Sequence, residues 1–251
     1  YLSGLKTWPE GKTEKAISEI SGAIDLNSGL DIYFRDISKL YLVRLNEIFQ
    51  RMDLSQEELR NKTQELINNA LNSAIRTTEI SPNNVANWNI RGFIYRNLIE
   101  LVSGTENWAI KSYEEAIKLE PQSPYIFNEI GLVFLAKADL LSRTSGQEKE
   151  ISENLNKAKD NFQKAIELKL DYPSAHFQLA MIYQREGKTK EAISKLEETK
   201  LIAPFDSGLA FQLGLLYYNN NQFDLAKGEF ERAVRIDESY SNARYFLGLI
   251  Y

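Results

Sequence analysis

The 251-residue chain has no cysteine, which excludes disulfide bridges, thiolate metal sites and cysteine nucleophiles. It has one histidine, His176, and one histidine cannot form a multi-histidine metal site. Its longest apolar runs, such as Ile130–Ala136, are far shorter than the roughly 20 residues that a membrane-spanning helix needs. No signal peptide is visible. The sequence therefore predicts no metal centre and no direct insertion of this segment into a membrane.

The chain also has no surplus of positive over negative charge. The chain carries 30 lysines and arginines against 35 acidic residues, a formal net charge of −5. Extended contact with nucleic acid needs a surplus of lysine and arginine on one face, so we expect no nucleic-acid partner. Hydrophobic residues make up 43% of the chain and charged residues 26%, which is typical of a folded protein.

One motif suggests phosphate binding. Gly-Lys-Thr occurs at residues 11–13 and again at 187–189. A phosphate-binding P-loop also needs a glycine five residues before the second one, and those positions hold Lys6 and Ile182. We interpret both copies as a glycine turn followed by a threonine helix cap, and His176 as a packing residue. The sequence thus predicts no catalytic residue, no cofactor site and no enzymatic activity.

What the sequence does contain is a repeat. Residues 113–119, 162–168 and 230–236 each read as an aromatic residue, two polar or charged residues, an alanine and a branched residue. Ala192 and Ala226 lie 34 residues apart, as do Gly214 and Gly248. A 34-residue period of helix–turn–helix units is the signature of the tetratricopeptide repeat.

The sequence resembles the tetratricopeptide family over essentially its whole length. In this family small residues let the two helices of a unit cross closely, while aromatic residues fill the gaps between units. The resemblance implies an all-α fold, a right-handed superhelical solenoid of antiparallel helix pairs with about twelve helices. The pattern departs from the family at Arg91, where a large apolar residue is expected, and at Leu170, where proline is usual.

The repeat columns divide the chain into seven parts. They are a partial unit at 1–30, an elongated unit at 31–84, a unit at 85–123, an elongated unit at 124–172, units at 173–206 and 207–240, and the first helix of a truncated unit at 241–251. The spacing Ala23–Thr77 exceeds one period by 20 residues, and the spacing Ala116–Ala165 exceeds it by 15. The first excess includes a possible capping box, Ser55 with Glu58. We expect longer helices there rather than inserted domains.

Both ends of the array are open. The chain begins at Tyr1 rather than at methionine, so we expect the natural N-terminus to be missing. A solenoid usually closes with a polar capping element, whereas residues 245–251 are strongly apolar. We expect either that more sequence follows or that this helix pairs with another copy of the chain.

In this family the first helices of successive units line a concave groove. The resemblance places sixteen partner-binding candidates in that groove, polar and basic in the first half and aromatic in the second: Arg35, Lys39, Asn89, Phe93, Arg96, Asn97, Asn128, Phe177, Met181, Gln184, Arg185, Phe211, Leu215, Tyr218, Asn219 and Tyr245. Exposed aromatic, methionine and arginine side chains are typical of protein-binding surfaces. An alternative is that longer helices or a further segment cover these side chains.

The version of the family that binds chaperone tails clamps a carboxylate with Lys and Asn, then Asn, then Lys and Arg, on three successive first helices. Arg35 and Lys39 resemble only the first part of that set, and the following helices do not supply the rest, so this function is not predicted.

The leading functional prediction is a non-catalytic scaffold that binds a peptide or partner protein in the groove, without a cofactor. Burial of Phe211 and Tyr218 within the array would contradict the aromatic half of that groove. Two alternatives remain. The chain also weakly resembles the repeat-bearing soluble part of bacterial O-antigen ligases or polysaccharide polymerases, which implies an appendage of a multi-span membrane protein. The second alternative is self-assembly through Tyr245–Tyr251.

Overall fold

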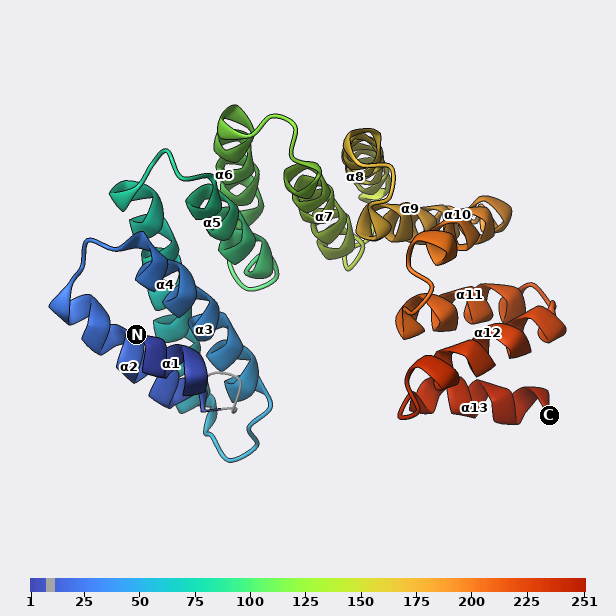
Figure 1. Ribbon diagram of the computed structural model, residues 1–251, viewed down its shortest axis with the longest axis horizontal. Helices are drawn as coiled ribbons and strands as arrows, with labels where there is room; N and C mark the ends of the chain where they lie inside the picture. The colour runs from blue at the N-terminus through green and yellow to red at the C-terminus, as the bar shows by residue number, and fades with distance from the viewer. Residues whose placement is uncertain (8–11) are drawn as a thin grey trace. The chain divides into compact units, whose positions relative to one another are not determined.

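The computed structural model describes residues 1–7 and 12–251, and within these residues the chain forms thirteen helices and no strand (Figure 1). They are α1 (Leu2–Thr7), α2 (Thr13–Leu26), α3 (Asp31–Phe49), α4 (Gln56–Ile80), α5 (Val85–Asn97), α6 (Thr105–Leu119), α7 (Pro124–Leu141), α8 (Glu148–Leu168), α9 (Pro173–Arg185), α10 (Thr189–Ile202), α11 (Ser207–Asn219), α12 (Phe223–Ile236) and α13 (Ser241–Ile250). The all-α prediction is confirmed, with one helix more than the twelve or so expected.

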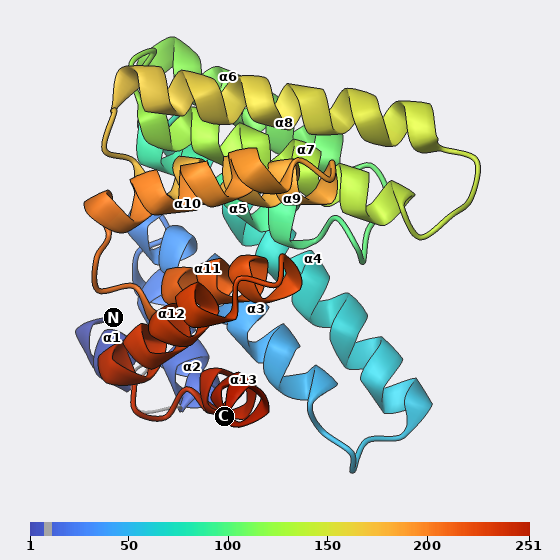
Figure 2. The same cartoon turned by 90° about the vertical axis from the view of Figure 1, so that its right-hand side faces the viewer.

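The helices fall into two compact units, Tyr1–Ile151 and Ser152–Tyr251, here called unit 1 and unit 2. Consecutive helices pack as hairpins within each unit: α3 with α4 and α5 with α6 in unit 1, and α9 with α10 and α11 with α12 in unit 2 (Figures 1 and 2). Each hairpin also packs against the first helix of the next one, as α4 does on α5 and α12 on α13. Within each unit this is the stacked arrangement expected of a helical solenoid.

Four helices are longer than the rest. The helices α3, α4, α7 and α8 have 19, 25, 18 and 21 residues, whereas α5, α6 and α9 to α12 have 13 to 15. The capping box at the start of α4 is confirmed, because the Ser55 hydroxyl accepts the Glu58 N–H and the Glu58 carboxylate accepts the Ser55 N–H. The additional residues of the sequence therefore lengthen helices. The boundaries assigned to the repeat units stay predictions.

Glycines in the first helices allow an aromatic ring of the second helix to lie directly on the backbone. A Cβ atom added at Gly92 of α5 would lie 2.6 Å from Cζ of Tyr113 in α6. One added at Gly214 of α11 would lie 2.6 Å from Cε1 of Phe230 in α12. Both rings are completely buried. The small residues of the repeat are therefore explained by close helix crossing in both units.

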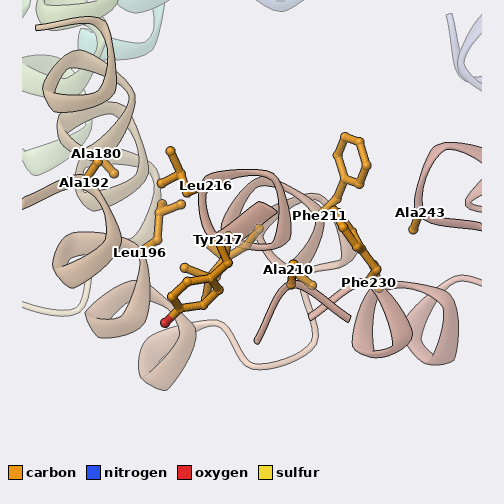
Figure 3. Close-up of a cluster of buried hydrophobic side chains, with 13 residues drawn as sticks. Ala180, Ala192, Leu196, Ala210, Phe211, Leu216, Tyr217, Phe230 and Ala243 are labelled. Carbon is orange, nitrogen blue, oxygen red and sulfur yellow. The ribbon is translucent and has the colours of Figure 1, made fainter. Parts of the chain in front are cut away.

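Unit 2 has a core built on α11 and α12 (Figure 3). The ring of Phe211 lies 5.7 Å from that of Phe230, measured between centroids, and that of Phe246 lies 5.2 Å from Phe230. Alanines at 226 and 233 flank Phe230 and are also fully buried. Aromatic pairs at such distances add stabilisation beyond the area they bury, so this ring cluster fixes how α11, α12 and α13 pack.

The departure at Arg91 has a structural reason. Its guanidinium carbon lies 5.5 Å from the Trp88 ring centroid and 5.8 Å from that of Tyr95. Its Nη1 donates a hydrogen bond of 2.9 Å to the Thr78 hydroxyl. A planar guanidinium stacks on aromatic faces and buries its stem, so Arg91 occupies a position that is usually apolar in the repeat.

The second Gly-Lys-Thr copy forms the turn between α9 and α10. Gly187 has φ +76°, a left-handed conformation that glycine adopts without steric cost. The expected threonine cap is wrong, because Lys188 is the N-cap residue and Thr189 is already helical. Gly11 of the first copy lies outside the described residues. The threonine cap expected there is also wrong, because Lys12 is the N-cap residue and Thr13, already helical, donates a hydrogen bond to Glu47.

His176 is buried, and its Nε2 lies 2.8 Å from the carbonyl oxygen of Leu170, which confirms its packing role.

Candidate functional site

Two first helices of unit 1 form a wall on which most of the predicted polar groove residues lie. The N-terminal ends of α3 and α5 meet at Asp31, whose Oδ2 accepts hydrogen bonds of 2.9 Å from Asn84 Nδ2 and 2.8 Å from Asn87 Nδ2. Asn87 is fully buried and also donates to the carbonyl oxygens of Thr77 and Ser81. This network sets α3 beside α5 with both helices running in the same direction.

A cavity of about 500 Å³ lies between these helices, with one residue of α7 at its edge. Its lining includes five of the predicted groove residues: Arg35 and Lys39 on α3, and Asn89, Phe93 and Asn97 on α5. The structure thus brings together in one hollow the candidates that the repeat columns place on two different helices.

The lining contains six further residues that the groove columns missed: Leu42, Val43, Asn46, Ala86, Ile90 and Tyr125. Most of them continue the helical stripes already begun by predicted residues. Positions 35, 39, 42 and 46 recur every three or four residues on α3, as one face of a helix requires. Following that spacing further along α3 would have found Leu42 and Asn46. Tyr125 lies in the first turn of α7 and has no such signal.

The cavity lining is positively charged. It contains Arg35 and Lys39 and no acidic residue. The buried Nε of Arg35 has no hydrogen-bond partner in the described part of the chain. The buried Oδ1 of Asn89 also lacks one. Buried polar groups are nearly always hydrogen-bonded, so these two atoms of the wall are exceptions to that rule.

Two acidic residues of α3, Asp31 and Asp36, have partners within the fold. The hydroxyl of Tyr1 donates a 2.6 Å hydrogen bond to Asp36 Oδ2, and Lys39 Nζ lies 3.7 Å from Asp36 Oδ1. Asp31 binds the two asparagines described above. Burial alone would raise the pKa of the Asp31 carboxyl, but the hydrogen bonds from Asn87 and Asn84, together with the positive charge of Arg35, lower that pKa below its ordinary value.

The lowered pKa of Asp31 predicts that the packing of α3 against α5 is sensitive to acid. A carboxyl whose pKa is lowered by folding stabilises the fold above its unfolded pKa, about 3.9, and that stabilisation is lost as the pH falls through the folded pKa. We expect the urea midpoint of unit 1 to drop between about pH 6 and about pH 3, and to drop less in Asp31→Asn. Asp25→Asn, an exposed change on α2, is the control. An equal drop in Asp31→Asn and the wild type would contradict this assignment.

Two predicted groove residues of unit 1 do not line the cavity. Arg96 lies over the Phe93 ring at 5.4 Å, and its Nη2 forms an ion pair of 3.2 Å with Glu129, which also accepts a hydrogen bond from Tyr113. Asn128 is only 3% exposed and already interacts with another group. Its prediction as an accessible groove amide is therefore wrong, because packing has taken up its side chain.

The aromatic half of the predicted groove needs a correction at Phe211. This side chain is 8% exposed, and its ring lies 5.2 Å from Tyr240 and 5.9 Å from Phe246, between centroids. Tyr218 is partly buried against Phe223 and Phe246. Phe211 fills the space beneath α13, so it belongs to the core of unit 2 and offers no surface to a partner.

The other candidates of unit 2 are divided between core and surface. Phe177, Met181 and Leu215 are partly buried and pack against the same core. Gln184, Arg185 and Asn219 are exposed, and Tyr245 is 64% exposed on α13. The cavity in unit 1 gathers five of the predicted residues, and it is the candidate functional site.

In the described part of the chain no helix is long and apolar enough to cross a membrane, and no group of three or more His, Cys, Asp or Glu side chains could hold a metal ion.

Comparison with known proteins agrees with this architecture. Two tetratricopeptide repeat family models match, one at residues 173–204 and the other at 211–251. The solved structure of a tetratricopeptide repeat protein from Parabacteroides merdae superposes with a TM-score of 0.62 at 16% identity, covering 98% of this chain and 81% of that protein.

Two curated proteins are also similar in sequence. Anaphase-promoting complex subunit 3 of Schizosaccharomyces pombe is 26% identical over 210 residues, which cover 79% of this chain and 28% of that protein. The human protein O-mannosyl-transferase TMTC3 is 26% identical over 184 residues, which cover 63% of this chain and 20% of that protein. The chain thus spans between a fifth and three tenths of the length of these relatives. Residues 173–204 and 211–251 are thus similar to tetratricopeptide repeats, and the chain has the fold of a solved protein of that kind.

Proposed function

We propose that this chain is a non-catalytic protein-interaction module that holds an extended segment of a partner protein in the cavity of unit 1. The observation that carries the proposal is the cavity itself, in which five predicted groove residues converge beside two buried polar atoms, of Arg35 and Asn89, that have no partner in the described part of the chain. Ligand pockets typically combine an apolar lining with a few convergent polar groups. Leu42, Val43, Ile90 and Phe93 supply the apolar part here.

The length of the cavity suits a short stretch of extended chain. The stripe from Arg35 to Asn46 on α3 spans about 16 Å at 1.5 Å per residue. An extended peptide advances about 3.3 Å per residue, so about five residues fit along the wall. The relative from Schizosaccharomyces pombe is a subunit of a multiprotein complex, which supports a role in holding partners. The surface-polysaccharide alternative gains no support from these similarities and stays a prediction, as does self-assembly.

A random peptide library displayed on phage tests this proposal. We expect peptides selected on the wild-type chain to bind the Phe93→Ala variant at least about tenfold more weakly, because Phe93 contributes apolar area to the cavity. Ala86→Phe, which fills the cavity without removing a core side chain, is expected to reduce binding similarly. Isothermal titration calorimetry measures both effects.

Phe49→Ala is the matched control, since Phe49 is a half-exposed phenylalanine of the same unit outside the cavity. Thermal unfolding shows whether each variant remains folded. Selected peptides that bind folded Phe93→Ala and Ala86→Phe as tightly as the wild type would place the binding site elsewhere and refute the proposal.

A further inference from the structure

The two positive side chains of the cavity share one face of α3. Arg35 and Lys39 are four residues apart, so they lie about 6 Å apart along the helix axis. In an extended peptide, side chains two residues apart point to the same side and are separated by about 6.6 Å. A peptide running along α3 would therefore present every second side chain to this pair at nearly matching spacing.

The intervening side chain of such a peptide points the opposite way. On that side lies α5, where Ile90 is buried and Phe93 is partly exposed in the lining. Asn89 and Asn97 of the same helix and Asn46 of α3 also line the cavity, and side-chain amides can both donate to and accept from a peptide backbone. Both cations of the lining thus lie on α3, Ile90 and Phe93 face them from α5, and each of the two helices also contributes amides.

From this arrangement we infer that the cavity selects an extended partner segment in which an apolar residue stands between two acidic ones. The inference rests on the proposed function and names the class of its ligand. Charge complementarity supports it, because the lining holds two cations and no acidic residue. The Nε of Arg35 has no hydrogen-bond partner in the described part of the chain, and the internal carboxylate on which its charge acts, Asp31, is held by Asn84 and Asn87.

The spacing also favours side-chain carboxylates over the single carboxylate at the end of a peptide. A terminal carboxylate brings a single negative charge to the two cations, whose positions on α3 are about 6 Å apart along the helix axis. Two glutamates or aspartates separated by one residue can satisfy both. Hydrogen bonds to charged groups contribute about 1.5–3 kcal/mol, so each pair is expected to change the affinity about tenfold or more.

Four short peptides test the inference by NMR titration of the wild-type chain. The first is the acetylated and amidated pentapeptide Ala-Glu-Leu-Glu-Ala. The second replaces both glutamates with glutamine, and the third, Ala-Glu-Glu-Leu-Ala, keeps the composition but changes the spacing. The fourth is the glutamine peptide with a free terminal carboxylate. We expect the first peptide to bind at least about tenfold more tightly than each of the other three, and its affinity to fall as salt is added.

Variants of the protein assign the effect to α3. Arg35→Gln is expected to weaken binding of the first peptide about tenfold, and Lys39→Gln to weaken it by a smaller factor, since Lys39 is shared with Asp36. Arg60→Gln, an exposed change on α4, is the matched control and should leave binding unchanged.

Equal binding of the first and third peptides would overturn the inference, as would undiminished binding to folded Arg35→Gln. Stronger binding of the fourth peptide would assign the site to a terminal carboxylate and also overturn it. In each of these cases the proposed function still stands if library-selected peptides bind Phe93→Ala more weakly. It fails if those peptides bind folded Phe93→Ala and folded Ala86→Phe as tightly as the wild type.

Discussion

Replacing Phe230 by alanine is expected to lower the free energy of unfolding of unit 2 by about 3–5 kcal/mol, the usual cost of removing a buried phenylalanine. The ring is completely buried on Gly214 and lies within 6 Å of the rings of Phe211 and Phe246. Its loss leaves a cavity where three helices meet. Because these helices hold one another through that ring cluster, collapse around the cavity is restricted, which places the cost at the upper part of the range.

Hydrogen exchange followed by mass spectrometry measures this effect locally. Peptides from α11, α12 and α13 should exchange much faster in Phe230→Ala than in the wild type. Phe223→Ala is the matched control, because Phe223 starts the same helix but is 45% exposed, and its loss should cost less than about 1 kcal/mol. Unchanged protection of α11–α13 in Phe230→Ala would show that the ring is not the centre of this core.

The second large effect is expected from Gly214→Ala. A glycine within a helix ordinarily costs about 1 kcal/mol relative to alanine, so this change would stabilise an open site. At Gly214 the new Cβ would lie 2.6 Å and 2.7 Å from two ring atoms of Phe230, which is too close for contact. Overpacking of this kind costs about 1–3 kcal/mol, so we expect net destabilisation in urea unfolding.

Two glycines of the same unit provide controls of opposite sign. Cβ atoms added at Gly228 of α12 and at Gly248 of α13 would meet nothing within 4 Å. Gly228→Ala and Gly248→Ala should therefore raise the free energy of unfolding by up to about 1 kcal/mol. Combining Gly214→Ala with Phe230→Leu should recover part of the loss, since the smaller side chain makes room. Additive effects in that double variant would contradict a direct clash.

The contrast between these glycines shows how far the sequence alone could go. The 34-residue period assigns Gly214 and Gly248 to the same column and predicts the same role for both. Only Gly214 has a ring against it in the structure. A repeat column specifies a position on a helix. The side chain that contacts this position depends on which helix packs against it.

Phe211 shows the same limit of the repeat columns, here for a position that was predicted to be exposed and is buried. Its column predicts a groove position, but three aromatic neighbours enclose it, among them Tyr240, which precedes α13. A residue just outside a helix is not part of the helical repeat, so its contact with Phe211 could not be read from the period. The period did predict the close helix crossings at Gly92 and Gly214, because they depend on backbone spacing that the repeat enforces.

For the cavity in unit 1, the sequence predicted which residue types gather there but not their state of pairing. Arg35 and Lys39 are both cations of the same helical stripe. Only the structure shows that Asp36 lies near Lys39, and that the Nε of Arg35 has no hydrogen-bond partner in the described part of the chain. Ion pairs depend on side-chain conformations that no helical period specifies. The period therefore could not predict the difference between the two cations.

The stability of helix α13 depends on the ring of Phe246. A helix of ten residues is too short to be stable alone in water, and the glycine at 248 weakens it further. Phe246 touches Phe211, Tyr218 and Phe230 at once, with ring centroids 5.2–5.9 Å apart. The helical state of α13 is therefore coupled to the integrity of α11 and α12. Any event that loosens the α11–α12 hairpin should release α13 in the same cooperative step.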